Sequence, residues 1–303
     1  MSVGSKHARF AYPVVILAVL FSSLSALLIR LNAAPPLAIA AGRMAFSTAM
    51  VVPILTLRRA RSYRRQGEAS SAEAGPRVKP TLLMLLAGAL LALHFATWIT
   101  SLSMTSVTHA TVLVTMHPLV VLVINAVFLR HGSGRRRLAG ALGAVAGAVV
   151  LSLGGSAAGR EPTLEGNLLA FTGAVAIAGY LVIGGRLRRS MDAWSYSLRV
   201  YGISAAGLVA LALLRGVPLT GYPARDVMLV VLLALLCTIL GHGLINWGLR
   251  YVSAADVSML ILLEPIFATV MAMVVLAEVP GPLSAVGAFL VVGSLALVSR
   301  RPA

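Results

Sequence analysis

A glutamate followed by a proline stands in the middle of an apolar run, where a carboxylate can hold a proton or an amine. Glu264 lies about ten residues into the run 254–277 and directly precedes Pro265. In a helix that crosses a membrane, a rise of about 1.5 Å per residue places it about 15 Å deep, halfway through a hydrocarbon core of about 30 Å. A charged side chain there costs at least about 2.5 kcal/mol. Glu264 is therefore expected to face a central polar site or to satisfy a neighbouring backbone or hydroxyl group.

A histidine occupies the same context earlier in the chain. His117 precedes Pro118 at a matching depth in the run 106–129. Proline lacks a backbone N–H group, so each of the two prolines should kink its helix and free carbonyl groups beside the polar residue. The two polar residues predict one central site built by two kinked helices, although a purely structural role is an equally good interpretation of His117.

Two polar stripes accompany these residues, each on one face of a helix because its members recur at spacings of three and four. The stripes are His94, Thr97, Trp98 and Ser101 in one run, and His242, Asn246 and Trp247 in a later run. Such a face is costly in lipid and is expected to look inward, where an aromatic ring beside a hydrogen-bonding group suits an amphipathic organic solute. For both tryptophans, anchoring at the membrane surface is an equally good interpretation.

Two arginines lie only one to two turns inside apolar runs. They are Arg43 in AAGRMAF and Arg199 in YSLRVYG. The simpler interpretation is that each guanidinium snorkels to the membrane surface. The alternative is that the arginines pair with a substrate carboxylate or line a gate.

The elements that must position these residues are apolar segments, which fill nearly the whole chain of 303 residues. The chain is 59% hydrophobic and 11% charged, with a mean hydropathy of +0.93, whereas a soluble domain carries about 25% charged residues. The composition predicts an all-α integral membrane protein and excludes a soluble globular enzyme. The single cysteine, Cys237, has no partner, so neither a disulfide framework nor a cysteine metal site is expected.

Ten apolar runs approach the length of about 20 residues that a membrane helix needs. They span 10–31, 35–57, 81–102, 106–129, 136–155, 164–186, 195–214, 227–249, 254–277 and 281–299. The sequence therefore predicts a bundle of ten transmembrane helices.

The basic residues sort unevenly among the connections between these runs. Of the 25 lysines and arginines, 19 fall on the side of the N-terminus, four on the opposite side and two within runs. The positive-inside rule then predicts that both termini are cytoplasmic, in the inner membrane of the cell. Topology and attraction to anionic lipid headgroups explain the net charge of +16, so no nucleic-acid partner is expected.

The second half of the chain repeats the first half weakly. At an offset of 147 residues stand Pro118 and Pro265, Gly140 and Gly287, and Ala141 and Ala288. Each half, 1–155 and 156–303, holds five runs, and an odd number makes the second half enter the membrane from the opposite side. Inverted repeats of this kind build secondary transporters, although a duplication can also simply build a stable bundle.

Several long motifs resemble the EamA branch of the drug/metabolite transporter superfamily, over essentially the whole chain. They are LLEPIFATVMAMVVLAEVPGPLSAVGAFLVVGSLAL, HFATWITSLSMTSVTHATVLVTMHPL and GHGLINWGLRYVSAADVSMLILLEP. The resemblance implies ten helices, cytoplasmic termini, a central cavity near helices three, four, eight and nine, and export of amino acids or other small metabolites in many members. His131 departs from the family, which usually has a glutamate there, while the second repeat keeps Glu278.

The predicted function is secondary active transport, as an exporter of small amphipathic metabolites such as amino acids by alternating access. Multidrug or toxic-compound efflux and a structural bundle without transport are the alternatives. The chain lacks the HExxH, GxSxG and Walker motifs, so no enzyme, cofactor or ATP-driven pump is expected. The expected partners are a small-molecule substrate, membrane lipids and a proton or counter-substrate. The small-residue patterns GALGAVAGAV and GAFLVVGSLA predict close helix packing, within a monomer or in a homodimer.

Overall fold

The computed structural model describes residues 3–65, 82–105, 107–128, 134–153, 163–276 and 281–299. Every regular element in these ranges is a helix, which confirms the predicted all-α class for this part of the chain. Helices suit an apolar chain because lipid offers no partner to backbone N–H and C=O groups, and a helix satisfies these groups within one segment.

The helices follow one another from α1 to α14, with one π-helical stretch, η1. Their bounds are α1 (Val3–Ser22), α2 (Leu24–Arg30), α3 (Pro36–Arg65), α4 (Leu82–Met104), α5 (Val107–Val114), α6 (His117–Val127), α7 (Arg135–Leu153), α8 (Leu164–Leu187), α9 (Ala193–Leu214), α10 (Ala224–Leu232), η1 (Leu233–His242), α11 (Gly243–Gly248), α12 (Ala254–Ile261), α13 (Glu264–Leu276) and α14 (Pro282–Ser299).

Eight helical stretches in the described ranges are long and apolar enough to cross a membrane. They are Phe10–Arg30, Pro36–Arg58, Leu82–Met104, Arg135–Leu153, Leu164–Leu187, Ala193–Leu214, Ala224–Gly248 and Ala254–Met271. Two further apolar helices, Val112–Val127 and Pro282–Leu297, are shorter. These two coincide with the predicted runs 106–129 and 281–299, so eight of the ten predicted spans reach membrane length here.

Two of the helical runs are broken at matching positions. α5 ends at Val114 and α6 begins at His117, while α12 ends at Ile261 and α13 begins at Glu264. The corresponding positions are 147 residues apart, which is the offset at which the sequence repeats. Each break therefore presents a polar residue at the first position of its second helix.

The prolines next to these polar residues lie in the first turn of the new helix. Pro118 is the second residue of α6, and Pro265 is the second residue of α13. A missing N–H group costs little there, because the first N–H groups of a helix have no partner within it. The predicted kinks are thus breaks with two non-helical residues, and each break precedes its proline.

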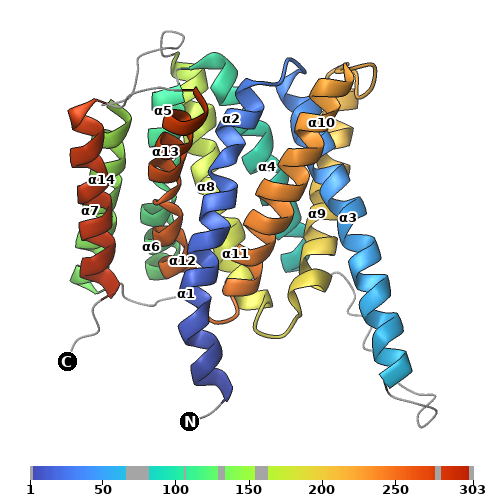
Figure 1. The fold of residues 1–303 in the computed structure, drawn as a ribbon, viewed down its shortest axis with the longest axis horizontal. Coiled ribbons are helices and arrows are strands. Elements are labelled where there is room, and N and C mark those ends of the chain that lie inside the picture. Colours follow the sequence, from blue (N-terminus) through green and yellow to red (C-terminus); the bar gives the residue numbers. More distant parts are fainter. Residues whose placement is uncertain are drawn as a thin grey trace.

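The small-residue patterns are used within the chain, where α7 packs along α14 (Figure 1). A Cβ atom added to Gly147 would lie 2.7 Å from the backbone nitrogen of Val291, and one added to Gly287 would collide with the backbone of Leu151. Only glycine allows the two helices to approach this closely. In Figure 1 this pair stands at one side of the bundle.

On the other side of the bundle, α4 contacts α3, α8 and α9 (Figure 1). α1 lies against η1 and α11, and it also contacts both segments of the broken helix α12–α13. The start of α1 and the end of α14 lie at the same end of the bundle (Figure 1). This arrangement brings the α1–α2 junction, α4, η1 and both breaks around a common interior space.

Candidate binding cavity

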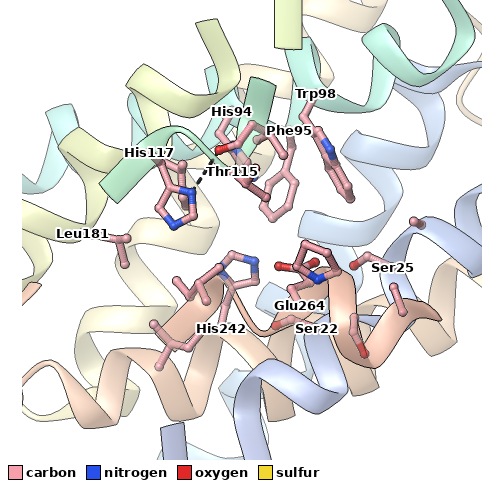
Figure 2. A pocket seen from close by; sticks show the side chains of 18 of the residues that line it. Ser22, Ser25, His94, Phe95, Trp98, Thr115, His117, Leu181, His242 and Glu264 are labelled. Atoms are coloured by element: carbon pink, nitrogen blue, oxygen red, sulfur yellow. Dashed lines mark hydrogen bonds between the residues drawn. The ribbon is translucent and has the colours of Figure 1, made fainter. Parts of the chain in front are cut away.

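A cavity lies among the two helix breaks, the α1–α2 junction, α3, α4, α8 and η1 (Figure 2). Its volume is about 90 Å³, counted as the space open to the centres of water molecules. One water needs about 10–15 Å³ on this measure, so the cavity has room for several waters or a small organic solute. It is lined by Ser22, Ser23, Ser25, Ala26, Arg43, His94, Phe95, Trp98, Val114, Thr115, His117, Ile177, Leu181, His242, Ile245, Ile261, Glu264, Pro265 and Ala268.

Most of the residues singled out from the sequence meet at this cavity. Those that line it are His94, Trp98, His117, His242 and Glu264, together with Arg43 and Pro265. Those that do not line it are Asn246, Trp247, Arg199 and Pro118. His131 and Glu278 lie outside the described residues.

Glu264 begins α13 and is the acidic residue among the described residues that line the cavity. Figure 2 shows its carboxylate directed into the space between Ser25 and His242. Within the described ranges, this carboxylate makes no hydrogen bond and no ion pair. The positive charge that acts on it is that of Arg43. A carboxylate in this position is free to accept a proton or to bind an amine.

Arg43 on α3 turns into the protein, with only 1% of its surface exposed. Its Nε donates to Thr238 Oγ1 at 2.8 Å, its Nη1 donates to Ser25 Oγ at 3.2 Å, and its guanidinium carbon lies 4.3 Å from the centre of the Phe95 ring. The snorkelling interpretation is therefore wrong for Arg43. Its buried Nη2 has no hydrogen-bond partner in the described part of the chain, and an unsatisfied buried donor of this kind favours an anionic ligand.

The π-helical stretch η1 supplies one partner of Arg43 and one wall of the cavity. Thr238 lies within η1, and His242 is its last residue. His242 meets the Phe95 ring edge-on at 5.4 Å and the Tyr180 ring at 6.5 Å, and its buried Nδ1 has no partner among the described residues. π-Helical turns are rare and often occur at functional sites.

His94 on α4 forms the opposite wall with Trp98. Its Nδ1 lies 2.9 Å from the carbonyl oxygen of Gly173, and because a carbonyl only accepts, Nδ1 carries the hydrogen. The imidazole stacks on the Trp98 ring with centroids 5.9 Å apart and planes 5° from parallel. Trp98 is 8% exposed, so it packs in the interior. The stripe residues Thr97 and Ser101 instead donate to carbonyls of their own helix.

His117 bridges the two breaks. Its Nδ1 lies 2.9 Å from the carbonyl oxygen of Val114 on α5, and its Nε2 lies 3.1 Å from that of Ser258 on α12. Val114 O would normally accept from residue 118, which is a proline without an N–H group. The N–H of Leu262, the normal partner of Ser258 O, donates instead to Met259 O. The imidazole thus meets two carbonyls that the breaks have freed.

Asn246 and Trp247 have partners away from the cavity. The Asn246 amide accepts from the hydroxyl of Tyr180 and donates to Ser197 Oγ at 3.1 Å and to Tyr201 Oη at 3.3 Å. Trp247 packs against Tyr251, with ring centroids 4.8 Å apart. The amide therefore ties α11 to α8 and α9.

Arg199 differs from its counterpart Arg43 in the first half. It is half-buried on α9, and its Nη1 lies 3.8 Å from the sulfur of Met84 and 4.0 Å from that of Met191. These are weak contacts, and no acidic residue in the described ranges pairs with it. The structure brings only one of the two arginines to the cavity.

The serines of the α1–α2 junction are the cavity residues that sequence reasoning missed. Ser22, Ser23 and Ser25 line the cavity, and Ser25 holds Arg43. The helix is interrupted at Ser23, between α1 and α2. The signal was present, because the serines interrupt the apolar run 10–31 near its middle.

Comparison with known proteins adds a family and a fold. The model of the EamA-like transporter family matches residues 9–153 and again residues 164–300. A solved structure titled only "Crystal structure of protein" covers 96% of this chain and 97% of its own, with a TM-score of 0.77 at 20% identity. At that identity the likeness shows the fold alone. No curated protein matches the chain.

Proposed function

Because the chain belongs to the EamA-like transporter family, whose model matches both halves, we propose that it is a secondary active transporter exporting small amphipathic metabolites, amino acids among them. Membership confirms the resemblance carried by the sequence motifs. It supports a membrane transporter of the drug/metabolite superfamily over an enzyme.

One observation carries the choice of substrate. The cavity contains an anionic group and a cationic group that do not form an ion pair with each other. Among the described residues, the Glu264 carboxylate has no hydrogen-bond or ion-pair partner, and Arg43 Nη2 has no hydrogen-bond partner. A zwitterion satisfies both groups, with its carboxylate on Arg43 and its amine on Glu264. Its apolar part then packs against Trp98, Phe95 and Leu181, which also line the cavity.

The proposed topology has ten spans, with both termini in the cytoplasm and the repeats 1–155 and 156–303 inverted in the inner membrane. The distribution of 19 basic residues against four supports this orientation. The matching helix breaks support the repeat. The start of α1 and the end of α14 at one end of the bundle support an even number of crossings (Figure 1).

Cysteine labelling tests this topology. With Cys237 replaced by serine, a cysteine placed within 67–75 is expected to react only from the cytoplasmic side, and one within 157–160 only from outside. Both segments lie outside the described residues, so the test depends only on the predicted connections. Reversed labelling in vesicles of known orientation would overturn the assignment.

Alternating access is the proposed mechanism, and the meeting of the two halves at the cavity supports it. His117 of the first half lies 3.1 Å from Ser258 O of the second half, so a movement of one half against the other changes this contact and the cavity together. Glu264 is the proposed carrier of the driving charge. It binds either the substrate amine or a proton, which couples export to a proton gradient or to a counter-substrate.

Counterflow in proteoliposomes tests the function. Vesicles are loaded with unlabelled candidates, namely amino acids, nucleosides, amines and drugs, and the uptake of a labelled one is followed. Saturable counterflow with amino acids is expected. Flux that neither saturates nor shows counterflow would indicate a channel. No flux for any candidate, in protein that remains monodisperse, would favour a structural bundle.

A further inference from the structure

A second hollow lies away from the central cavity, between α8, the chain between α11 and α12, and the ends of α6 and α7. Its volume is about 480 Å³ on the same measure. Four arginines line it, Arg137, Arg186, Arg189 and Arg250, and none of the described residues that line it is acidic. Arg137 in the first turn of α7 lines it, and α14 ends at the same end of the bundle at which α7 begins (Figure 1).

The nearby acidic residues are already engaged. Asp256 lies 3.4 Å from Arg137 and accepts from Ser253 Oγ at 2.7 Å. Asp192 caps α9 by accepting two backbone N–H groups of its first turn, each at 3.1 Å. In the described ranges no carboxylate forms an ion pair with the other three arginines of the hollow. The charge of these three arginines therefore has no carboxylate partner in the described part of the chain.

Two further donors lie beside this cluster. Arg188 is 1% exposed, its Nε donates to Asn246 O at 2.7 Å, and its buried Nη1 has no partner within the described ranges. The charges of Asp192 and Arg250 both act on it. Ala254 and Ala255, the first residues of α12, line the hollow, and N–H groups in the first turn of a helix have no partner within it and attract anions.

We propose that this hollow binds a phosphate group, either the headgroup of an anionic phospholipid or a soluble phosphate ester. Guanidinium groups match phosphate oxygens in pairs, and three arginines that no described carboxylate pairs with would gain most from such a ligand. Basic pockets between membrane helices are known to hold anionic headgroups. The inference is independent of the central cavity and of what that cavity transports.

Native mass spectrometry of the full chain, with phosphatidylglycerol and phosphatidylcholine as probes, tests the proposal. The wild-type protein is expected to retain one phosphatidylglycerol in preference to phosphatidylcholine. Each arginine near a headgroup is worth about fivefold in affinity, so Arg186→Gln/Arg250→Gln should weaken binding about 25-fold. The control Arg215→Gln/Arg225→Gln removes the same charge from exposed positions outside the hollow and should bind like the wild type.

Glycerol 3-phosphate distinguishes the two sources. Binding of this soluble ester to the wild type, lost in the hollow variant, assigns the site to soluble phosphates, while binding of phosphatidylglycerol alone assigns it to lipid. The proposal would be overturned if the hollow variant bound phosphatidylglycerol and glycerol 3-phosphate as well as the wild type does. It would also be overturned if the control variant lost binding as much as the hollow variant does. The melting temperature of each variant in phosphatidylcholine alone checks that it is folded. If Arg186→Gln/Arg250→Gln melts at a lower temperature than the wild type, binding is measured with Arg250→Gln alone.

Discussion

The two helix breaks share one register, yet their polar residues are satisfied differently. At the α5–α6 break, His117 is 3% exposed, with its ring nitrogens 2.9 Å and 3.1 Å from the carbonyl oxygens of Val114 and Ser258. At the α12–α13 break, Glu264 makes no hydrogen bond or ion pair with the described residues and faces the cavity. One break is closed by its own side chain, and the other is open to a ligand.

The difference follows from the chemistry of the two side chains. A neutral imidazole carries one N–H group, which can donate to the carbonyl that a following proline leaves without a partner. A carboxylate only accepts, so Glu264 cannot do the same for Ile261 O, the carbonyl equivalent to Val114 O. The repeat therefore provides the same backbone twice, and the residue at the first position of the second helix decides whether the break is structural or available for binding.

Removing the charge of Glu264 gives the largest expected effect. Glu264→Gln keeps the volume and removes a charge-assisted hydrogen bond to the substrate amine, which is worth about 1.5–3 kcal/mol, or about 10- to 100-fold. Counterflow at low substrate concentration should therefore fall by up to about 100-fold. The melting temperature should change little, because no partner in the described chain loses a hydrogen bond.

The matched control is Glu165→Gln, which removes a carboxylate from the exposed first turn of α8. It should transport like the wild type. Full transport by Glu264→Gln, with an unaltered pH profile, would show that Glu264 has a structural role. The two breaks would then not differ in function.

His117 should show the opposite balance of effects. His117→Phe keeps a ring of similar shape and removes both nitrogens, so the buried carbonyl that accepts the imidazole N–H loses its donor. Each unsatisfied group costs about 1–3 kcal/mol, so an unfolding free energy lower by about 2 kcal/mol is expected. Denaturant titration in detergent measures it. A stable His117→Phe protein with abolished transport would instead place His117 among the binding residues.

Replacing the two arginines related by the repeat, Arg43 and Arg199, should produce effects of intermediate size. Arg43→Gln removes the free Nη2 from the cavity, so the KM for a substrate with a carboxylate should rise about tenfold, the effect of one charge-assisted hydrogen bond. Arg199→Gln, which leaves the cavity lining intact, should change the KM little. Equal effects of the two substitutions would mean that Arg199 reaches the substrate in another conformation.

The sequence predicted where the two breaks lie, because each position depends on neighbouring residues of the chain. Pro118 and Pro265 can be read directly from the sequence, together with the offset of 147 residues between them. Membrane-length apolar runs and the polar residues within them are local in the same sense. The all-α class, the family and the meeting of Glu264, His94 and His242 at one cavity could therefore be anticipated.

What could not be predicted depends on partners from other helices. Asn246 has the same stripe position as a cavity residue, but Tyr180, Ser197 and Tyr201 engage its amide. Arg43 turns inward because Thr238 and Ser25 hold its guanidinium. Thr238 lies in a π-helical stretch, and the residue types of that stretch do not distinguish a π-helix from an α-helix.

Replacing the prolines should produce the smallest effects and the finest test of the comparison. Pro118→Ala adds an N–H that competes for Val114 O, a carbonyl that His117 already meets at 2.9 Å, so little should change. Pro265→Ala adds an N–H for Ile261 O, which Glu264 cannot satisfy. One net hydrogen bond of about 1 kcal/mol then favours the continuous helix over the broken one by about fivefold.

A continuous helix would turn the Glu264 carboxylate away from its present position. Transport by Pro265→Ala should therefore fall severalfold, while Pro118→Ala transports like the wild type, both measured by counterflow at equal protein content. The reverse order would show that the break at His117 carries the conformational change, because the contact from His117 to Ser258 O joins the two halves. The α5–α6 break would then be the functional one, and the α12–α13 break would be structural.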